Sequence, residues 1–429
     1  MRAVQATNAE RGFLPCLILS FLAIRLLWLF RVHGGVAGFL SAAEAQRVAL
    51  SIALHGVIGD AYYDGQGPTA HLLPLNPLVA GGVMWLFGPG STAANLALLG
   101  LSLGQVLAGY LLVRLVFARL GVDPLVVRWG TALLLLLPPF VPQETIDFRY
   151  WEGGSALWLV ALNMLAMIAL ARRDRLRRRD LVAIPALFAV IFFVSPPAGI
   201  AVGACWAIVA LRRLPLASSV ALAAATAAAL VLVIAPWAFR NAQVMGEPIL
   251  LRSNFGLELA LANHPAAVSG EAPEDVYIDR VLAIHPAANA AARAAIRAHG
   301  EAAYSRALAD ETRAWIAANP LAFARLWARH VSEIFAPRPW QMDFSGWGGA
   351  RAARAGTIAV IQLVGLFGLA IALLAGRTRY WIPAVYIGVV AVFFGFFQPM
   401  PRYGFIIYPF LCFPAVEAIA AAVARLRRS

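Results

Sequence analysis

Lysine is absent from this sequence of 429 residues, and all 35 of its basic residues are arginine. Charged residues of every kind make up only 13% of the chain, whereas hydrophobic residues reach 61%. Average soluble domains are about 25% charged and roughly 45–50% apolar, so a soluble protein of this length could not bury so much apolar surface. The composition therefore predicts an all-α polytopic membrane protein, and it excludes disordered, collagen-like and disulfide-rich secreted classes.

Cysteine is also scarce: Cys16, Cys205 and Cys412 each lie in an apolar run, where we expect small core residues. The sequence contains no P-loop and no GxGxxG motif before a helix, which argues against a nucleotide-driven mechanism. The net charge of +13 would suggest nucleic acid as the partner of a soluble protein, but here the arginines flank apolar runs and no nucleic-acid partner is expected. The exclusive use of arginine has two open explanations, a GC-rich genome and recognition of phosphate by guanidinium groups.

Apolar runs predict about ten transmembrane helices, within a range of ten to twelve, because a hydrocarbon core of about 30 Å needs roughly 20 apolar residues. The candidate spans are 13–31, 92–118, 126–143, 153–171, 181–194, 196–211, 216–237, 355–375, 380–397 and 403–424. Arginine clusters predict which segments face the cytoplasm, because 18 of the 35 arginines fall on one side of this arrangement. Both termini are then cytoplasmic, and residues 72–88 form a half-buried or re-entrant element.

This topology divides the chain into three parts. Residues 1–237 form an N-terminal transmembrane module with two short acidic external loops, 32–73 and 143–152. Residues 238–354 form a small external α-rich cap with 11 of the 22 acidic residues, and we expect most of its charges to be solvated. Alanine-rich amphipathic stretches predict helices in this cap near 287–298, 301–318 and 321–335. Residues 355–429 return to the membrane as C-terminal helices.

Six acidic residues fall in the two short external loops: Glu44, Asp60, Asp64, Glu144, Asp147 and Glu152. Carboxylates at a membrane surface can act as general bases or as ligands of a divalent metal. Glu44 opens a predicted amphipathic surface helix, where it either performs chemistry or pairs with Arg47. Glu152 either belongs to the site or stabilises a helix N-terminus. His55 and His71 could add metal ligands, but their spacing leaves a metal site open.

Several motifs along residues 44–409 resemble those of GT-C bacterial membrane glycosyltransferases related to protein O-mannosyltransferases and the lipid A aminoarabinose transferase (glycosyltransferase family 39). They include Glu44 to Gly56, Gly67 to Leu78, Trp151-Glu152, Pro236 to Asn241, Arg252 to Pro265 and Pro401-Arg402-Tyr403. Many members of that family have Asp in the first loop, where this chain has Glu44. The order of the motifs along the chain matches the expected one.

The resemblance implies transfer of a sugar from a polyprenyl-phosphate carrier to a glycan, lipid or protein acceptor at the outer face of the bacterial plasma membrane. It implies an inverting displacement in which Glu44 is the base and Glu152 orients the acceptor or a metal. Arg402, Arg240, Arg252 and Arg149 are the implied phosphate-binding residues, since a guanidinium matches a phosphodiester bidentately. Tyr403 and His71 complete the expected substrate-binding set.

Three other functions stay open at this point. A transporter or flippase of a lipid-linked sugar would carry ionisable residues inside its spans and internal repeats, whereas Arg25 is the one clear charge within a predicted span. A polysaccharide polymerase or ligase would also use external arginines without needing Glu44. A non-catalytic assembly protein would tolerate substitution of every candidate residue.

Overall fold

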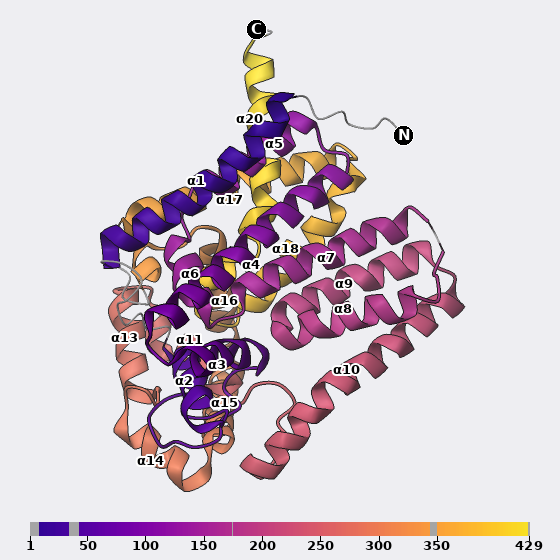
Figure 1. Cartoon of the computed structure of the whole chain (residues 1–429). Helices are drawn as coiled ribbons and strands as arrows, with labels where there is room; N and C mark the ends of the chain where they lie inside the picture. The colour runs from indigo at the N-terminus through magenta and orange to yellow at the C-terminus, as the bar shows by residue number, and fades with distance from the viewer. Residues whose placement is uncertain (1–7, 34–42, 174, 344–349, 428–429) are drawn as a thin grey trace.

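The computed structural model describes residues 8–33, 43–173, 175–343 and 350–427. Over these ranges the regular structure is helical, and one isolated antiparallel bridge joins Gly59 to Pro68. Figure 1 shows long helices in the upper part of the molecule and a group of shorter helices below them on the left. The expected all-α class is confirmed.

Among the residues described, six helices are long and apolar enough to cross a membrane. They are α1 (Asn8–His33), α4 (Thr92–Arg119), α7 (Gly153–Ala171), α10 (Leu216–Met245), α17 (Arg351–Leu374) and α20 (Tyr408–Leu426). A seventh candidate is bent by 72° between α5 (Pro124–Leu136) and the segment made of α6 (Val141–Thr145) and η1 (Asp147–Arg149). The expected count of about ten spans is therefore not confirmed.

Short helices account for the difference. Three expected spans form α8 (Asp180–Val194), α9 (Pro196–Arg213) and α18 (Trp381–Phe394). α8 and α18 contain 15 and 14 residues, fewer than the roughly 20 that a crossing requires, and α9 is less apolar because it begins with two prolines and ends with two arginines. Residues 72–88 contain α3 (Leu75–Phe87), whose 13 residues are also too few for a full crossing.

The long helices pack in pairs. α4 packs against α7, α17 packs against α20, and α9 packs against both α8 and α18. α10 lies at one side of this bundle and packs mainly against α8 (Figure 1), so that only 6% of its most apolar stretch is buried. Most of the apolar surface of α10 is therefore not covered by the other described elements.

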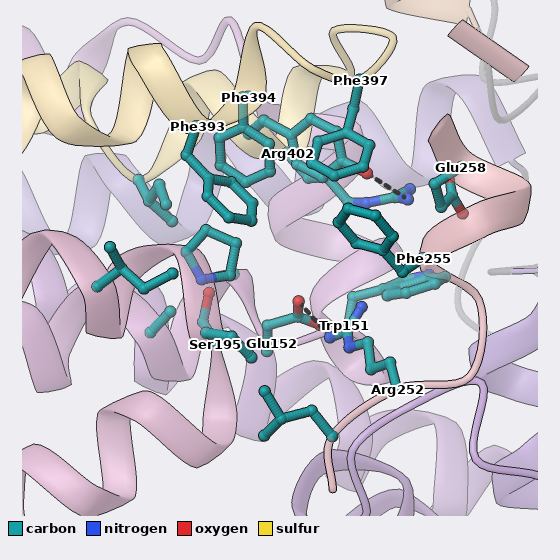
Figure 2. Close-up of a pocket in the computed structure, with 18 of the residues that line it drawn as sticks. Trp151, Glu152, Ser195, Arg252, Phe255, Glu258, Phe393, Phe394, Phe397 and Arg402 are labelled. Carbon is teal, nitrogen blue, oxygen red and sulfur yellow. Dashed lines mark hydrogen bonds and ion pairs between the residues drawn. The ribbon is translucent and has the colours of Figure 1, made fainter. Parts of the chain in front are cut away.

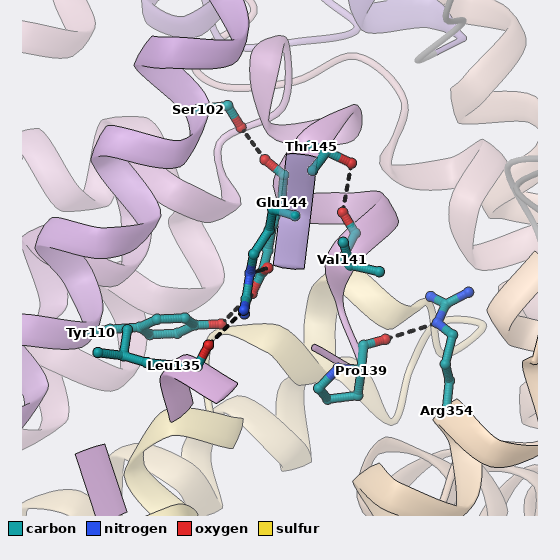
Figure 3. Close-up of polar contacts among 9 residues, drawn as sticks. Ser102, Tyr110, Leu135, Pro139, Val141, Glu144, Thr145 and Arg354 are labelled. Carbon is teal, nitrogen blue, oxygen red and sulfur yellow. Dashed lines mark hydrogen bonds and ion pairs between the residues drawn. The ribbon is translucent and has the colours of Figure 1, made fainter. Parts of the chain in front are cut away.

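A buried ion pair lies inside the bundle and corrects one expectation. Glu144 was expected in an acidic external loop, but its side chain is buried and its Oε2 accepts a hydrogen bond from the Nε of Arg25 at 2.7 Å. Tyr110 donates its hydroxyl to the same carboxylate at 2.5 Å, and Arg25 also donates to the carbonyl of Leu135 (Figure 3). Residues 141–151 are all buried, so this segment is part of the core.

The shorter helices of the lower group form the α-rich cap. They are α11 (Phe255–Ala262), α12 (Pro265–Val268), α13 (Pro273–Ile284), α14 (Ala290–His299), α15 (Glu301–Ala318), α16 (Pro320–Phe335) and η2 (Pro339–Asp343). The three helices expected in the cap are thus present. α2 (Glu44–His55) and α3 lie beside the cap (Figure 1) and pack against each other. η3 (Thr378–Tyr380) precedes α18, and α19 (Pro401–Phe405) precedes α20.

Candidate functional site

A cavity of about 340 Å³ lies where the bundle meets the cap. Residues at the start of α7, at the junction of α8 and α9, at the start of α11, at the end of α18 and in α19 line it. Figure 2 shows aromatic side chains along one part of the wall and charged side chains along another. The cavity is therefore amphipathic.

The apolar part of the wall is made by three helices. Phe192 of α8 and Pro197 of α9 line the cavity together with Phe393 and Phe394 of α18. The sequence Ser195-Pro196-Pro197 ends α8 and starts α9, and all three residues line the cavity. This part of the cavity offers no charged group to a ligand and suits a hydrocarbon chain.

Two arginines and two glutamates make the polar part. An Arg252 Nη lies 2.8 Å from an Oε1 of Glu152, the residue that precedes α7. The guanidinium carbon of Arg402 lies 4.3 Å from the centre of the Trp151 ring, a distance typical of a cation–π contact. Glu258 lies beside that guanidinium (Figure 2). Two guanidinium groups therefore face one cavity, each next to a carboxylate.

Tyr403 and Phe394 connect the two parts of the wall. Their rings are stacked with centroids 4.0 Å apart, and the Tyr403 hydroxyl lies 3.5 Å from an Nη of Arg402. The aromatic face of Tyr403 thus continues the apolar wall, while its hydroxyl belongs to the polar group.

Glu44 and His71 do not line this cavity, but Arg402, which does, and His285 of the cap act electrostatically on both. The Nε2 of His285 is 3.4 Å from Glu44 Oε1, and its Nδ1 accepts the backbone N–H of Ala287, so Nε2 carries the proton. Burial raises the pKa of Glu44, but His285, His71, a backbone hydrogen bond and, least of all, Arg402 together outweigh it and hold that pKa below its usual value. Glu44 is therefore ionised at neutral pH.

His71 is held by a tyrosine of its own loop. Its Nδ1 lies 2.9 Å from the Tyr62 hydroxyl, and the ring is buried. Burial lowers the pKa of His71 to about 3, so the imidazole is neutral throughout the physiological range. His71 can donate or accept a hydrogen bond there, but it brings no positive charge.

Comparison with known proteins bears on the fold. No family model matches the sequence, and no curated protein matches it. The archaeal oligosaccharyltransferase AglB of Archaeoglobus fulgidus is similar in structure, both in complex with an inhibitory peptide and a dolichol-phosphate (TM-score 0.50, 13% identity, 96% of this chain) and in the apo form (0.52, 14%, 95%). The fold of this chain therefore resembles the part of that oligosaccharyltransferase that it covers.

The chain is shorter than the oligosaccharyltransferase that it resembles. This chain covers 51% of the oligosaccharyltransferase, and it therefore spans about half of that protein's length. ArnT of Cupriavidus metallidurans bound to undecaprenyl phosphate also matches, at 16% identity over 97% of this chain and 79% of that one, with a TM-score of 0.34.

The fold brings some of the expected site residues together and keeps others apart. Glu152, Arg252, Arg402 and Tyr403 all line the cavity. Arg240 does not, because its guanidinium donates to the carbonyls of Ile58 and Thr69 at 2.7 and 2.8 Å.

Arg149 also lies outside the lining. It is buried, its Nε donates to the carbonyl of Thr145, and its two Nη atoms have no hydrogen-bond partner among the residues that the structure describes. Sequence spacing alone did not separate these arginines from the two at the cavity.

Glu258 is a site residue that the sequence reasoning missed. It lies within the 252–265 motif, but a lone acidic residue in a charged cap gives no sign that it faces a cavity. Burial raises its pKa, and Arg402 acts in the opposite direction. No group of three or more His, Cys, Asp or Glu residues suited to a metal occurs in the described ranges, and His55 is exposed at the end of α2.

Proposed function

We propose that this protein is a GT-C-type glycosyltransferase that moves a sugar from a polyprenyl-phosphate carrier to a glycan, lipid or protein acceptor at the outer face of the plasma membrane. The observation that carries the proposal is the amphipathic cavity, in which an aromatic wall leads to Arg252 and Arg402. A lipid phosphate has the same two parts, since an apolar chain ends in an anion that guanidinium groups bind bidentately. The similarity in fold to a structure containing dolichol-phosphate supports the proposal.

The donor enters sideways, between α18 and the α8–α9 pair, so that its chain lies against Phe192, Phe393 and Phe394. Its phosphate takes the place at Arg252 that Glu152 occupies at 2.8 Å. Glu152 then becomes free to accept a hydrogen bond from the acceptor. The same carboxylate keeps the guanidinium oriented until the donor arrives.

The reaction is a direct displacement at the anomeric carbon. Glu44 removes the proton of an acceptor hydroxyl or amine, and the resulting nucleophile forms a bond to that carbon from the face opposite the phosphate. The bond between the carbon and the phosphate oxygen breaks, and its electron pair leaves with the polyprenyl phosphate. Arg402 and Arg252 stabilise the charge that develops on the leaving group. The configuration of the sugar is inverted.

A substitution of Glu44 tests the function and the role together. Purified wild-type, Glu44→Gln and Asp64→Asn proteins are incubated with a panel of radiolabelled polyprenyl-phosphate sugars and membrane extract, and loss of label from the lipid is followed. Asp64 is the control because it is an exposed acid of the same loop. We expect wild type and Asp64→Asn to consume one donor, and Glu44→Gln to be slower by about 10²–10⁴-fold, the usual contribution of a general base.

Two results would contradict this. Unchanged turnover by Glu44→Gln would remove Glu44 from its role as the base. Movement of a donor between liposome leaflets without cleavage would support a flippase in place of a transferase.

A further inference from the structure

Glu301, the first residue of α15, has an unusual environment for an acidic residue of the cap. Its side chain is only 6% exposed. Oε2 accepts hydrogen bonds from Gln66 Nε2 and Thr69 Oγ1, each at 2.7 Å. Oε1 accepts the backbone N–H of Ala70 at 2.7 Å and the hydroxyl of Ser253 at 2.6 Å. One carboxylate thus receives four hydrogen bonds from two distant segments of the chain.

The donors leave little freedom for another side chain at this position. Gln66 uses its Oε1 to accept the backbone N–H of Tyr62 at 2.9 Å, so its NH₂ group faces Glu301. Thr69 Oγ1 accepts the backbone N–H of His71 at 3.0 Å while it donates to Glu301. The N–H of Ala70 can only donate. A carboxylate satisfies this set because both of its oxygens are acceptors.

The two segments that meet at Glu301 carry residues of the candidate site. His71 directly follows Ala70, and Arg252 directly precedes Ser253. The N–H of Ser253 also donates to the carbonyl of Ala70 at 3.0 Å, which joins the segments to each other. Arg252 extends from this junction to the cavity and to Glu152. A shift at the junction would therefore move the Arg252 guanidinium.

We propose that Glu301 is a positioning residue, whose buried carboxylate fixes the segments 66–71 and 252–253 so that Arg252 and His71 are held in place for the lipid phosphate. This inference rests on the proposed function. Glu301 touches neither donor nor acceptor, and it acts through the segments that it joins. Burial raises the pKa of Glu301 above its usual value and outweighs the four hydrogen bonds, which act in the opposite direction because they favour the ionised carboxylate.

The first variant is Glu301→Gln, which keeps the shape of the side chain. Its NH₂ group then faces either the NH₂ of Gln66 or the N–H of Ala70, and neither can accept. Hydrogen bonds to charged groups are stronger than those between neutral groups, so we expect binding of polyprenyl phosphate, measured with the lipid alone in detergent micelles, to weaken by about tenfold. The KM for the sugar donor should rise by a similar factor.

Two further variants separate positioning from general stability. Glu311→Gln is the matched control, since Glu311 is an exposed acid of the same helix, and its affinity should equal that of wild type. The double variant Gln66→Glu with Glu301→Gln exchanges the carboxylate and the amide across the contact, and it should recover most of the affinity. A lower melting temperature with unchanged donor affinity in Glu301→Gln, or a loss that the exchange does not restore, would overturn the proposal.

Amide hydrogen exchange tests the positioning without any donor. In Glu301→Gln the amides of Ala70 and Ser253 should exchange faster than in wild type, while those of α7 are unchanged. If the wild-type protein fails to bind polyprenyl phosphate, the proposed function fails, and the exchange rates still report on the junction. Unchanged exchange at both amides would overturn the role of Glu301 by itself.

Discussion

Two glutamates near Arg402 differ in how readily they take up a proton. The pKa of Glu44 is lowered, because His285, His71, a backbone hydrogen bond and Arg402 together outweigh burial. The pKa of Glu258 is raised by burial, and the charge of Glu44 adds to the effect. Carboxylates whose surroundings move their pKa values apart commonly divide acid and base roles. This split keeps Glu44 available as a base at neutral pH.

The raised pKa of Glu258 predicts a stability that falls as pH rises. Near pH 4 the group is largely protonated in both folded and unfolded protein and costs little. Above the ordinary value of 4.5 the unfolded chain ionises first, so the folded state loses stability until Glu258 is ionised in both states. Glu258→Gln should therefore melt at a higher temperature than wild type at pH 7.5 and at nearly the same temperature at pH 4, as thermal unfolding in detergent would show. An equal difference at both pH values would contradict this explanation.

At the level of single residues, the sequence predicted part of the candidate site. Arg402, Tyr403, Arg252 and Glu152 follow apolar runs or aromatic clusters, and the fold brings all four to one cavity. Glu258 and Glu301 lie in helices of a cap that is rich in charge. Whether such a residue is solvated or buried depends on how α11 and α15 pack, which no local pattern encodes.

Among the elements, α6 shows how a proline-containing bend can place an acidic residue inside the bundle. Residues 137–140 separate α5 from α6 and include two prolines, and the chain bends there by 72°. Glu144 is thereby directed into the bundle to meet Arg25 of α1. Hydropathy marks where the apolar run ends, but it does not give the direction of the chain after the bend. For that reason the sequence predicted an external acid.

Because Arg25 and Glu144 form a buried ion pair, we expect the loss of either residue alone to destabilise the protein more than the loss of both. Arg25→Leu leaves a buried carboxylate without its partner, which typically costs about 3–5 kcal/mol. Replacing both residues, with Arg25→Met and Glu144→Gln, should cost much less, because no buried charge is left unpaired. Unfolding in detergent would measure the two variants, with the exposed Arg31→Leu on the same helix as the control. Equal losses in the single and the double variant would show that the two residues do not stabilise each other.

For the whole molecule, composition was sufficient to predict a helical membrane protein but not the number of its spans. Hydropathy located the six long apolar helices of the described residues, because an apolar run of about 20 residues is typical of a transmembrane helix. It did not distinguish a full crossing from the shorter α8 and α18, whose ends are set by Pro196 and by the 395–400 turn. The start of α1 and the end of α20 lie at the same end of the molecule (Figure 1).

The arginine distribution predicts that this end faces the cytoplasm and that the cap faces outward. We expect a membrane-impermeant maleimide to label a His299→Cys variant in right-side-out vesicles, and to label an Arg175→Cys variant only after permeabilisation. Both positions are exposed, and Cys16, Cys205 and Cys412 are replaced in the background. The opposite pattern of labelling would invert the orientation and move the cavity to the other face.

The length of α10 links the cavity to the thickness of the bilayer. Its 30 residues give a rod of about 45 Å, whereas the hydrocarbon core measures about 30 Å, so α10 must tilt or extend into the headgroups. Near its carboxyl end, Arg240 binds the carbonyls of Ile58 and Thr69 in the segment that leads to His71. We therefore expect a change in the acyl-chain length of the lipid to alter the tilt of α10 and, through Arg240, the position of the segment that leads to His71.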